Sequence, residues 1–202
     1  MGEIIEYHRN GQIKERGTTV NGMLDGEVSS YSETGALLQK ATFQEGILSG
    51  PTTIFDDKGG MIQRMNFSAG LLDGQMIVYN EGIKQLVATY KDGLLNGDMF
   101  NYDENGQPKA RSQYKTGKLE GESFWVDKNG TLIRKSQYHA GKLNGETIEY
   151  YPSGKMLERS QYLNNQLHGE VTKYSEDGKV KERLFFKDGK PCPPPQAATR
   201  RS

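Results

Sequence analysis

The sequence predicts an all-β protein in which about eight tandem β-hairpin repeats form an elongated antiparallel meander, a single twisted sheet. Three observations support this prediction. A glycine and leucine motif returns about every 24 residues, and a second series of glycines lies half a period away. The segments between these glycines have the length and composition of β-strands.

The first observation is the motif Gly-x-Leu-x-Gly, which begins at Gly22, Gly46, Gly70, Gly93, Gly117 and Gly141. A seventh copy runs from Asn165 to Gly169, where asparagine replaces the first glycine. Asparagine is the other residue that tolerates a positive φ. The motif therefore indicates a tight turn at the same point of each repeat.

The second glycine series places another turn in each repeat. It comprises Gly11, Gly35, Gly59, Gly82, Gly106, Gly130, Gly154 and Gly178. Turns then recur about every 12 residues, and the segments of 6 to 8 residues between them are rich in Tyr, Phe, Val, Ile and Thr. This alternation of strand and turn predicts a meander.

Aromatic residues occupy two slots in most hairpins. The first slot holds Tyr7, Tyr31, Phe55, Tyr79, Tyr102, Val126, Tyr150 and Tyr174. The second holds Thr19, Phe43, Phe67, Tyr90, Tyr114, Tyr138, Tyr162 and Phe186. Because strand side chains alternate between faces, we expect the columns at fixed offsets to stack along one face of the sheet. Each hairpin buries little alone, so neighbouring hairpins should stabilise one another.

The array is expected to span residues 1–190, with repeats that start near residues 2, 26, 50, 74, 97, 121, 145 and 169. Pro191 follows, and then Pro193 to Pro195. Proline cannot donate to a further strand ladder, so it should stop the array and blunt its open edge. We expect residues 191–202 to be a proline-rich disordered tail.

Composition argues against several classes of protein. The 26 basic and 26 acidic residues balance, which removes the overall positive charge typical of nucleic-acid binders. The single cysteine, Cys192, excludes an internal disulfide or a cysteine zinc site. The three histidines, His8, His139 and His168, are spread over repeats one, six and seven, and no phosphate-binding loop or nucleophile motif is present. We expect a protein that is not an enzyme and has no cofactor or metal.

Three segments show the most regular form of the repeat: Tyr150-Tyr151-Pro152-Ser153-Gly154-Lys155, Ser160-Gln161-Tyr162 and Gly141-Lys142-Leu143-Asn144-Gly145-Glu146. In this form the repeat resembles a known family, the bacterial variant of the MORN repeat, and the resemblance covers residues 2 to about 190. Pro51, Thr19 and the shortened Glu81-Gly82 hairpin depart from the pattern. The resemblance implies an elongated sheet of hairpins without a catalytic centre. It also implies an immunity or antitoxin protein that binds and neutralises a partner toxin, such as a type VI secretion effector.

A column of basic residues is the main candidate for a binding surface. It comprises Arg16, Lys40, Arg64, Arg111, Lys135, Arg159 and Arg183, interrupted by Val87. Its parity places it on the face opposite the second aromatic column. Such a row can bind an acidic protein partner or lipid phosphates. Alternatively, it only keeps an exposed face soluble, with Glu15, Glu158 and Glu182 neutralising it.

Trp125 is the single tryptophan and departs from the repeat, because its slot holds Glu6, Ser30, Ile54, Val78, Asn101, Glu149 and Lys173 elsewhere. On the polar face it would be an interface anchor. If the local register shifts, it is a core residue instead. The partner-binding candidates are Arg64, Arg111, Trp125, Lys135 and Arg159.

The leading functional hypothesis is therefore a protein-binding module that occludes a toxin, without nucleic-acid binding. The alternative is a structural scaffold or membrane-associated organiser that binds anionic lipid. The first residues, Met1 to Asn10, lack the basic segment followed by an apolar segment that is typical of a signal peptide. We therefore expect a cytoplasmic protein, or a periplasmic one if a leader is removed.

Overall fold

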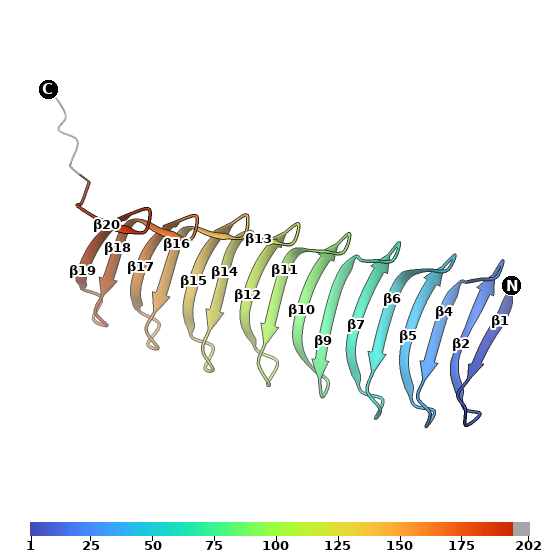
Figure 1. The fold of residues 1–202 in the computed structure, drawn as a ribbon. Coiled ribbons are helices and arrows are strands. Elements are labelled where there is room, and N and C mark those ends of the chain that lie inside the picture. The colour runs from blue at the N-terminus through green and yellow to red at the C-terminus, as the bar shows by residue number, and fades with distance from the viewer. Residues whose placement is uncertain (196–202) are drawn as a thin grey trace. The chain divides into compact units, whose positions relative to one another are not determined.

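The computed structural model describes residues 1–195, which form β-strands and turns and contain no helix (Figure 1). The predicted all-β hairpin meander is confirmed, and no helix within 1–195 could span a membrane. The chain divides into two compact units, Met1–Gln107 and Pro108–Ser202. Each unit carries an open antiparallel sheet in which successive strands pair.

The first unit contains β1 (Gly2–Tyr7), β2 (Ile13–Val20), β3 (Met23–Leu24), β4 (Gly26–Tyr31), β5 (Leu37–Gln44), β6 (Ile47–Phe55), β7 (Met61–Ser68), β8 (Leu71–Leu72), β9 (Gly74–Asn80), β10 (Ile83–Lys91) and β11 (Leu94–Tyr102). The second contains β12 (Pro108–Lys115), β13 (Lys118–Leu119), β14 (Gly121–Val126), β15 (Leu132–His139), β16 (Lys142–Tyr150), β17 (Met156–Leu163), β18 (Gln166–Tyr174), β19 (Val180–Lys187) and β20 (Lys190–Cys192).

The turn that opens each Gly-x-Leu-x-Gly motif has two residues with positive φ. In the first repeat these are Asn21 at 52° and Gly22 at 79°, the combination required by the mirror-image turns that fit the twist of a hairpin. Neighbouring turns are linked to one another, because the Gly141 N–H donates to the Leu119 carbonyl at 2.8 Å. The motif thus closes one hairpin and attaches it to the next.

At the other end of most hairpins five residues connect the two strands, and only Glu81 and Gly82 connect β9 with β10. In the sixth hairpin the Asp127 N–H donates to the Thr131 carbonyl at 2.8 Å, and the Asp127 carboxylate accepts the N–H groups of Asn129 and Thr131. The Thr131 N–H lowers the pKa of Asp127 below its usual range because it stabilises the charged carboxylate. A β-bulge at Trp125 and Val126 adjoins this turn, and the register shifts there by one residue.

The register assigns each column to one face. Residues that pair across two strands project to the same side, and Phe100 pairs with Val87 of the basic column. Tyr102 of the first aromatic column is two residues beyond Phe100 on β11, so it projects to that side too, and the two ring centroids are 6.3 Å apart. The first aromatic column therefore shares a face with the basic column. The second lies opposite, since Tyr138 and Lys135 are three residues apart on one strand. Each aromatic column keeps to one side, but the two columns occupy opposite faces.

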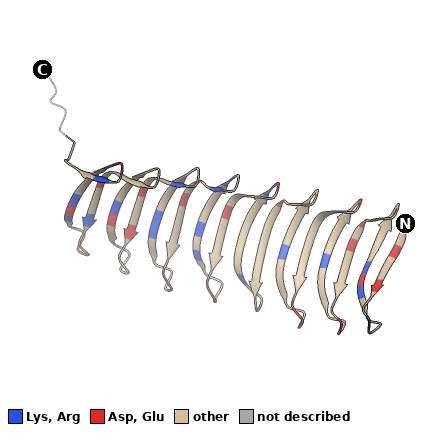
Figure 2. Cartoon of the chain, viewed as in Figure 1, with Lys and Arg blue, Asp and Glu red and all other residues tan. Residues whose placement is uncertain are grey.

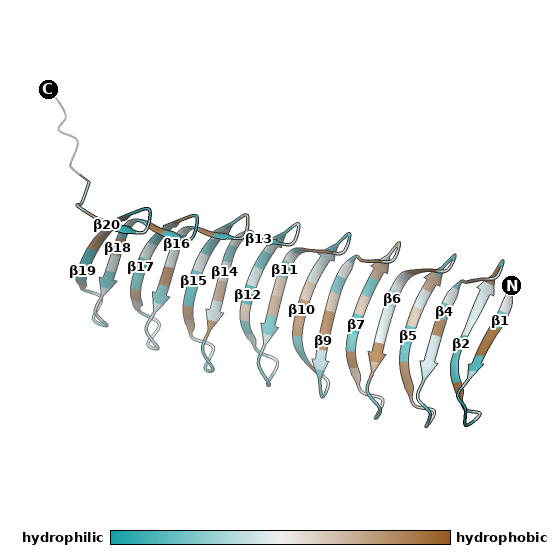
Figure 3. Ribbon diagram, in the orientation of Figure 1, coloured by the Kyte–Doolittle hydropathy of each residue, from teal (hydrophilic) through white to brown (hydrophobic). Residues whose placement is uncertain are grey.

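Most buried side chains form one row on the face opposite the basic column, at the middle of the strands, while Val87, Ser29 and Thr172 are buried on the basic face. In the first unit the row includes Gly17, Val28, Ala41, Thr52 and Ala88, and in the second it includes Ser112, Ser123, Ser136, Thr147, Ser160 and Val171. Most of these side chains are small and nearly all are buried. Figure 3 shows hydrophobic and hydrophilic residues distributed along the strands of both units. The stability of the fold therefore comes from many small contacts between neighbouring hairpins.

The last strand corrects one expected boundary. β20 includes Pro191, which pairs with Phe186, and Cys192, which pairs with Phe185, so the array runs two residues past the predicted end at 190. Within residues 1–195, β20 pairs with β19 alone, and proline is tolerated at such an edge because no ladder on the open side requires its missing N–H. The predicted disorder of the tail falls in part on residues 196–202, which lie outside the described residues.

Candidate binding surface

The basic column forms a regular row in each unit, on the side of the sheet that we call the basic face. Its members in the first unit are Arg16, Lys40 and Arg64, and in the second Arg111, Lys135, Arg159 and Arg183. Figure 2 shows basic residues recurring from hairpin to hairpin, with acidic residues nearby. The predicted parity of the column relative to the second aromatic column is confirmed by the register.

Most of these cations are held by a carboxylate that lies thirteen residues earlier in the chain, on the preceding strand. The pairs are Arg16 Nε to Glu3 Oε1 at 2.7 Å, Lys40 Nζ to Glu27 Oε1 at 2.8 Å, Lys135 Nζ to Glu122 Oε2 at 2.8 Å, Arg159 Nε to Glu146 Oε2 at 3.0 Å and Arg183 Nε to Glu170 Oε1 at 3.5 Å. The hydrogen bond to Glu122 raises the pKa of Lys135, and the bond to Glu27 raises that of Lys40. The basic face is therefore largely neutralised within the chain.

The neutralising acids differ from those that the sequence suggested. Glu15, Glu158 and Glu182 directly adjoin cations in the sequence, so their side chains project to the opposite face. There Glu182 Oε2 pairs with Lys173 Nζ at 2.9 Å, and Glu158 accepts a hydrogen bond from the Ser160 hydroxyl. The acids after the closing glycines are the true partners, because antiparallel pairing brings them diagonally beside the cations.

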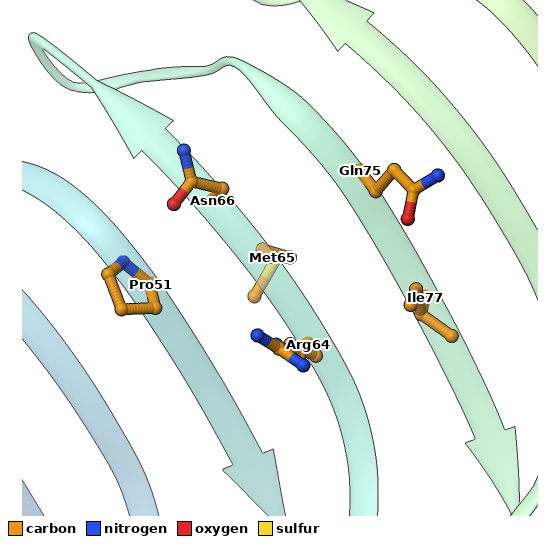
Figure 4. Close-up of a pocket in the computed structure, with 6 residues that line it drawn as sticks. All are labelled: Pro51, Arg64, Met65, Asn66, Gln75 and Ile77. Carbon is orange, nitrogen blue, oxygen red and sulfur yellow. The ribbon is translucent and has the colours of Figure 1, made fainter.

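Arg64 is the exception in the row. The residue thirteen positions before it is Pro51, and within residues 1–195 no carboxylate lies within ion-pair distance of its guanidinium. Figure 4 shows Arg64 on β7, with Pro51 on β6 to one side and Gln75 and Ile77 on β9 to the other. Together with Asn66, these residues line a hollow of about 190 Å³ that contains one cation and no acid.

Two other hollows on the basic face have a different character. One, of about 300 Å³, is lined by both members of the Arg16–Glu3 and Lys40–Glu27 pairs. The other, of about 250 Å³, is lined by Lys135 with Glu122 and Glu146. In both, the charges are already compensated by partners from the same chain.

Trp125 lies on the face opposite the basic face. It pairs with Ala110 and Arg134, is half-buried, and the Arg134 guanidinium carbon lies 5.6 Å from its ring centroid, in a cation–π contact. Its bulge is the one that the other hairpins share, for example between Glu149 and Tyr150. Trp125 is therefore neither on the polar basic face nor displaced by a register shift of its own.

The five sequence-derived candidates are thus not one cluster. Arg111, Lys135 and Arg159 follow one another on the basic face of the second unit, Trp125 lies on its other side, and Arg64 belongs to the first unit. Sequence reasoning missed Arg134, which contacts Trp125, and the carboxylates of the diagonal pairs. A fixed spacing of thirteen residues between acid and base is the signal that could have found those pairs.

Each of the three histidines has a separate local role. His8 Nε2 lies 2.8 Å from the Tyr31 carbonyl, His139 Nδ1 lies 2.9 Å from Glu120, and His168 Nδ1 lies 3.1 Å from Asp188. In the part of the chain that the structure describes, no three histidine, cysteine or acidic side chains gather as metal ligands. The histidines therefore join neighbouring hairpins.

The fold and surface define a class of protein, an open antiparallel array of β-hairpin repeats with a charged, solvent-exposed face. Within that class, the chain belongs to the MORN repeat variant family, whose sequence model matches residues 2–21, 24–45, 95–116, 119–140, 143–164 and 167–188. Repeats of this family generally serve as protein- or lipid-binding modules and are not enzymatic.

Comparisons with other proteins add little beyond this assignment. No protein with a curated function matches the sequence. Structural matches include a GtfA/B complex bound to UDP and GlcNAc, 14% identical, with a TM-score of 0.24 over 55% of this chain and 22% of that one. A Photorhabdus luminescens Tc holotoxin pore is 12% identical, with a TM-score of 0.24 over 92% of this chain and 12% of that one. A TcdB2-TccC3-Cdc42 structure is 11% identical, with a TM-score of 0.22 over 92% and 13%. The chain thus spans less than a quarter of each.

Proposed function

We propose that this protein is a non-catalytic immunity or antitoxin protein, which binds a toxic effector, such as one of type VI secretion, and occludes it. The observation that carries the proposal is the basic face, a regular row of exposed charged side chains on an otherwise uncovered sheet. Charged rows of this kind favour selective protein partners, because complementary charge aligns the two surfaces. The compartment, cytoplasm or periplasm, then follows from where the effector acts.

Co-expression with the toxin encoded beside this gene tests the proposal. We expect the protein to relieve growth arrest and to elute with the toxin as one complex in size-exclusion chromatography. Reversing the charge of Arg159 and Lys135 to glutamate should slow formation of the complex, because it leaves Glu122 and Glu146 without their cations and makes the face acidic towards an acidic partner. A toxin that kills equally with and without this protein, and forms no complex, would exclude the immunity role.

A second candidate is a scaffold that binds anionic lipid. It is favoured by a row of exposed apolar side chains beside the turns of the first unit: Met23, Ile47, Leu71 and Leu94. The same slot in the second unit holds Lys118, Lys142, Gln166 and Lys190. An exposed apolar row with basic residues elsewhere suits the boundary between headgroups and acyl chains.

Vesicle sedimentation separates the two candidates. A lipid-binding protein should sediment with phosphatidylserine vesicles and be released by salt, since salt screens surface charge. Binding should fall with Leu71→Lys and with charge reversal of Arg111, Lys135 and Arg159. If the protein stays in the supernatant at low salt, the lipid candidate is excluded.

A further inference from the structure

The acid and base pairs of the basic face form a ladder that repeats from hairpin to hairpin. In Arg159–Glu146, for example, the Arg159 Nε donates to both oxygens of Glu146 at 3.0 Å. A partner carboxylate that approaches such a cation meets a charge that an acid of the same chain already compensates. These positions therefore contribute little new attraction to a complex.

The ladder is interrupted at the third and fourth hairpins. Pro51 stands where the other hairpins have an acid before Arg64, Gln75 follows the next closing glycine, and Val87 replaces the next cation. The interruption lies within residues 46–94, which the family matches leave out. It leaves one uncompensated guanidinium, Arg64, between hydrogen-bonding and apolar side chains.

We propose that Arg64 is the anchor point for an aspartate or glutamate side chain of a protein partner. The planar guanidinium offers paired N–H donors that match the two oxygens of a carboxylate. The Gln75 amide lines the same hollow and adds a further donor, while Pro51 and Ile77 form apolar walls. These walls limit water around the contact, which strengthens it relative to an open surface pair.

This inference rests on the protein-binding part of the proposed function and does not require that the partner be a toxin. The occupant is identified by charge complementarity, because the hollow contains a cation without an acid. Its size suits a single side chain. A carboxylate peptide can therefore stand in for the partner.

Nuclear magnetic resonance of the arginine side chains provides the test. The full chain, labelled at arginine with ¹⁵N, is titrated with the peptide acetyl-Leu-Glu-Leu-Glu-Leu-amide and, as a control, with its glutamine counterpart. We expect the Arg64 Nε–H signal to shift saturably with the glutamate peptide and not with the control. The signals of Arg16 and Arg159 should respond at least about tenfold more weakly, because their N–H groups already donate to carboxylates.

Two variants make the test specific. Pro51→Glu restores the acid of the other hairpins, so the Arg64 response should be lost although the arginine remains. Glu146→Gln opens the ladder at Arg159, whose signal should begin to respond to the peptide. Arg64→Gln should abolish the saturable shifts of neighbouring amides, and this variant alters only an exposed side chain. Equal responses from all arginines, a response to the glutamine peptide, or an undiminished Arg64 response in Pro51→Glu would overturn the inference.

Discussion

Buried hydroxyl groups make up most of the core row of the second unit, and some of them have hydrogen-bond partners while others have none. The Ser136 Oγ accepts the Arg134 Nε–H at 3.0 Å and the Thr147 hydroxyl at 3.1 Å. The equally buried Ser123 Oγ, by contrast, has no partner within the described chain. A buried polar atom without a partner loses its hydration and gains nothing in return.

This difference predicts opposite effects of two alanine substitutions. Ser123→Ala should leave the free energy of unfolding unchanged or raise it by up to about 1 kcal/mol, because it removes an unsatisfied hydroxyl. Ser136→Ala should lower it by about 1 to 2 kcal/mol, because it removes the acceptor of Arg134 and Thr147. Urea unfolding followed by tryptophan fluorescence measures both. A larger loss for Ser123→Ala than for Ser136→Ala would contradict the assignment.

A second prediction concerns the turn around Asp177. The Ser175 hydroxyl, the Lys179 ammonium and the Lys179 N–H hold the charged carboxylate and lower the pKa of Asp177 from 3.8 to about 2. A lowered folded-state pKa gives stability that is present above about pH 4 and is lost as the pH falls towards 2. Carboxyl ¹³C shifts should give a midpoint near 2, and Ser175→Ala should raise it. A midpoint near 4 in the unaltered protein would exclude these bonds.

At the scale of the hairpin, the closing glycine of each motif has an unusual backbone. Gly145 has a φ of 110°, and a Cβ there would lie 3.1 Å from the Gln137 Cβ. Gly130, in the opposite turn, has a φ of 81° and open space around it. Alanine at Gly130 would therefore have a positive φ alone, whereas alanine at Gly145 would have both a positive φ and a crowded Cβ.

Gly145→Ala should therefore destabilise the protein more than Gly130→Ala does. We expect a loss of about 2 to 3 kcal/mol at Gly145 and about 1 kcal/mol at Gly130, because only the former adds a close contact to a positive φ. Thermal and urea unfolding of the two variants provides the comparison. Equal losses would show that the Gln137 side chain moves aside without cost.

The hairpins were predictable from the sequence because glycine marks their turns and the strand columns repeat at a fixed period. The face to which a side chain projects could also be predicted within one strand, because Lys135 and Tyr138, three residues apart on β15, lie on opposite faces as expected. The pairing of acids with bases was not, because it depends on diagonal contacts such as Glu122 with Lys135 that only the register defines. The contact of Arg134 with Trp125 likewise joins neighbouring strands and leaves no signal along the chain.

At the scale of the molecule, contacts are local in sequence. Within each unit, paired strands are either consecutive or separated only by a two-residue strand, as in the pairing of β12 with β14. Neither unit has a central core that all strands share, since the buried side chains form a row. Such an array gains stability from each hairpin and its immediate neighbours.

This locality predicts that damage to one hairpin stays near it. In Gly145→Ala, the protection of backbone amides against hydrogen exchange should fall most in β16, which contains the substitution, and in the nearby strands β15, β17 and β18. Strands β4 to β6 of the first unit should keep the protection of the unaltered protein, because no pairing joins them to the altered hairpin. A globally cooperative fold would instead lose the same free energy of opening at every slowly exchanging amide. Exchange measured residue by residue therefore decides between additive hairpins and a single cooperative unit.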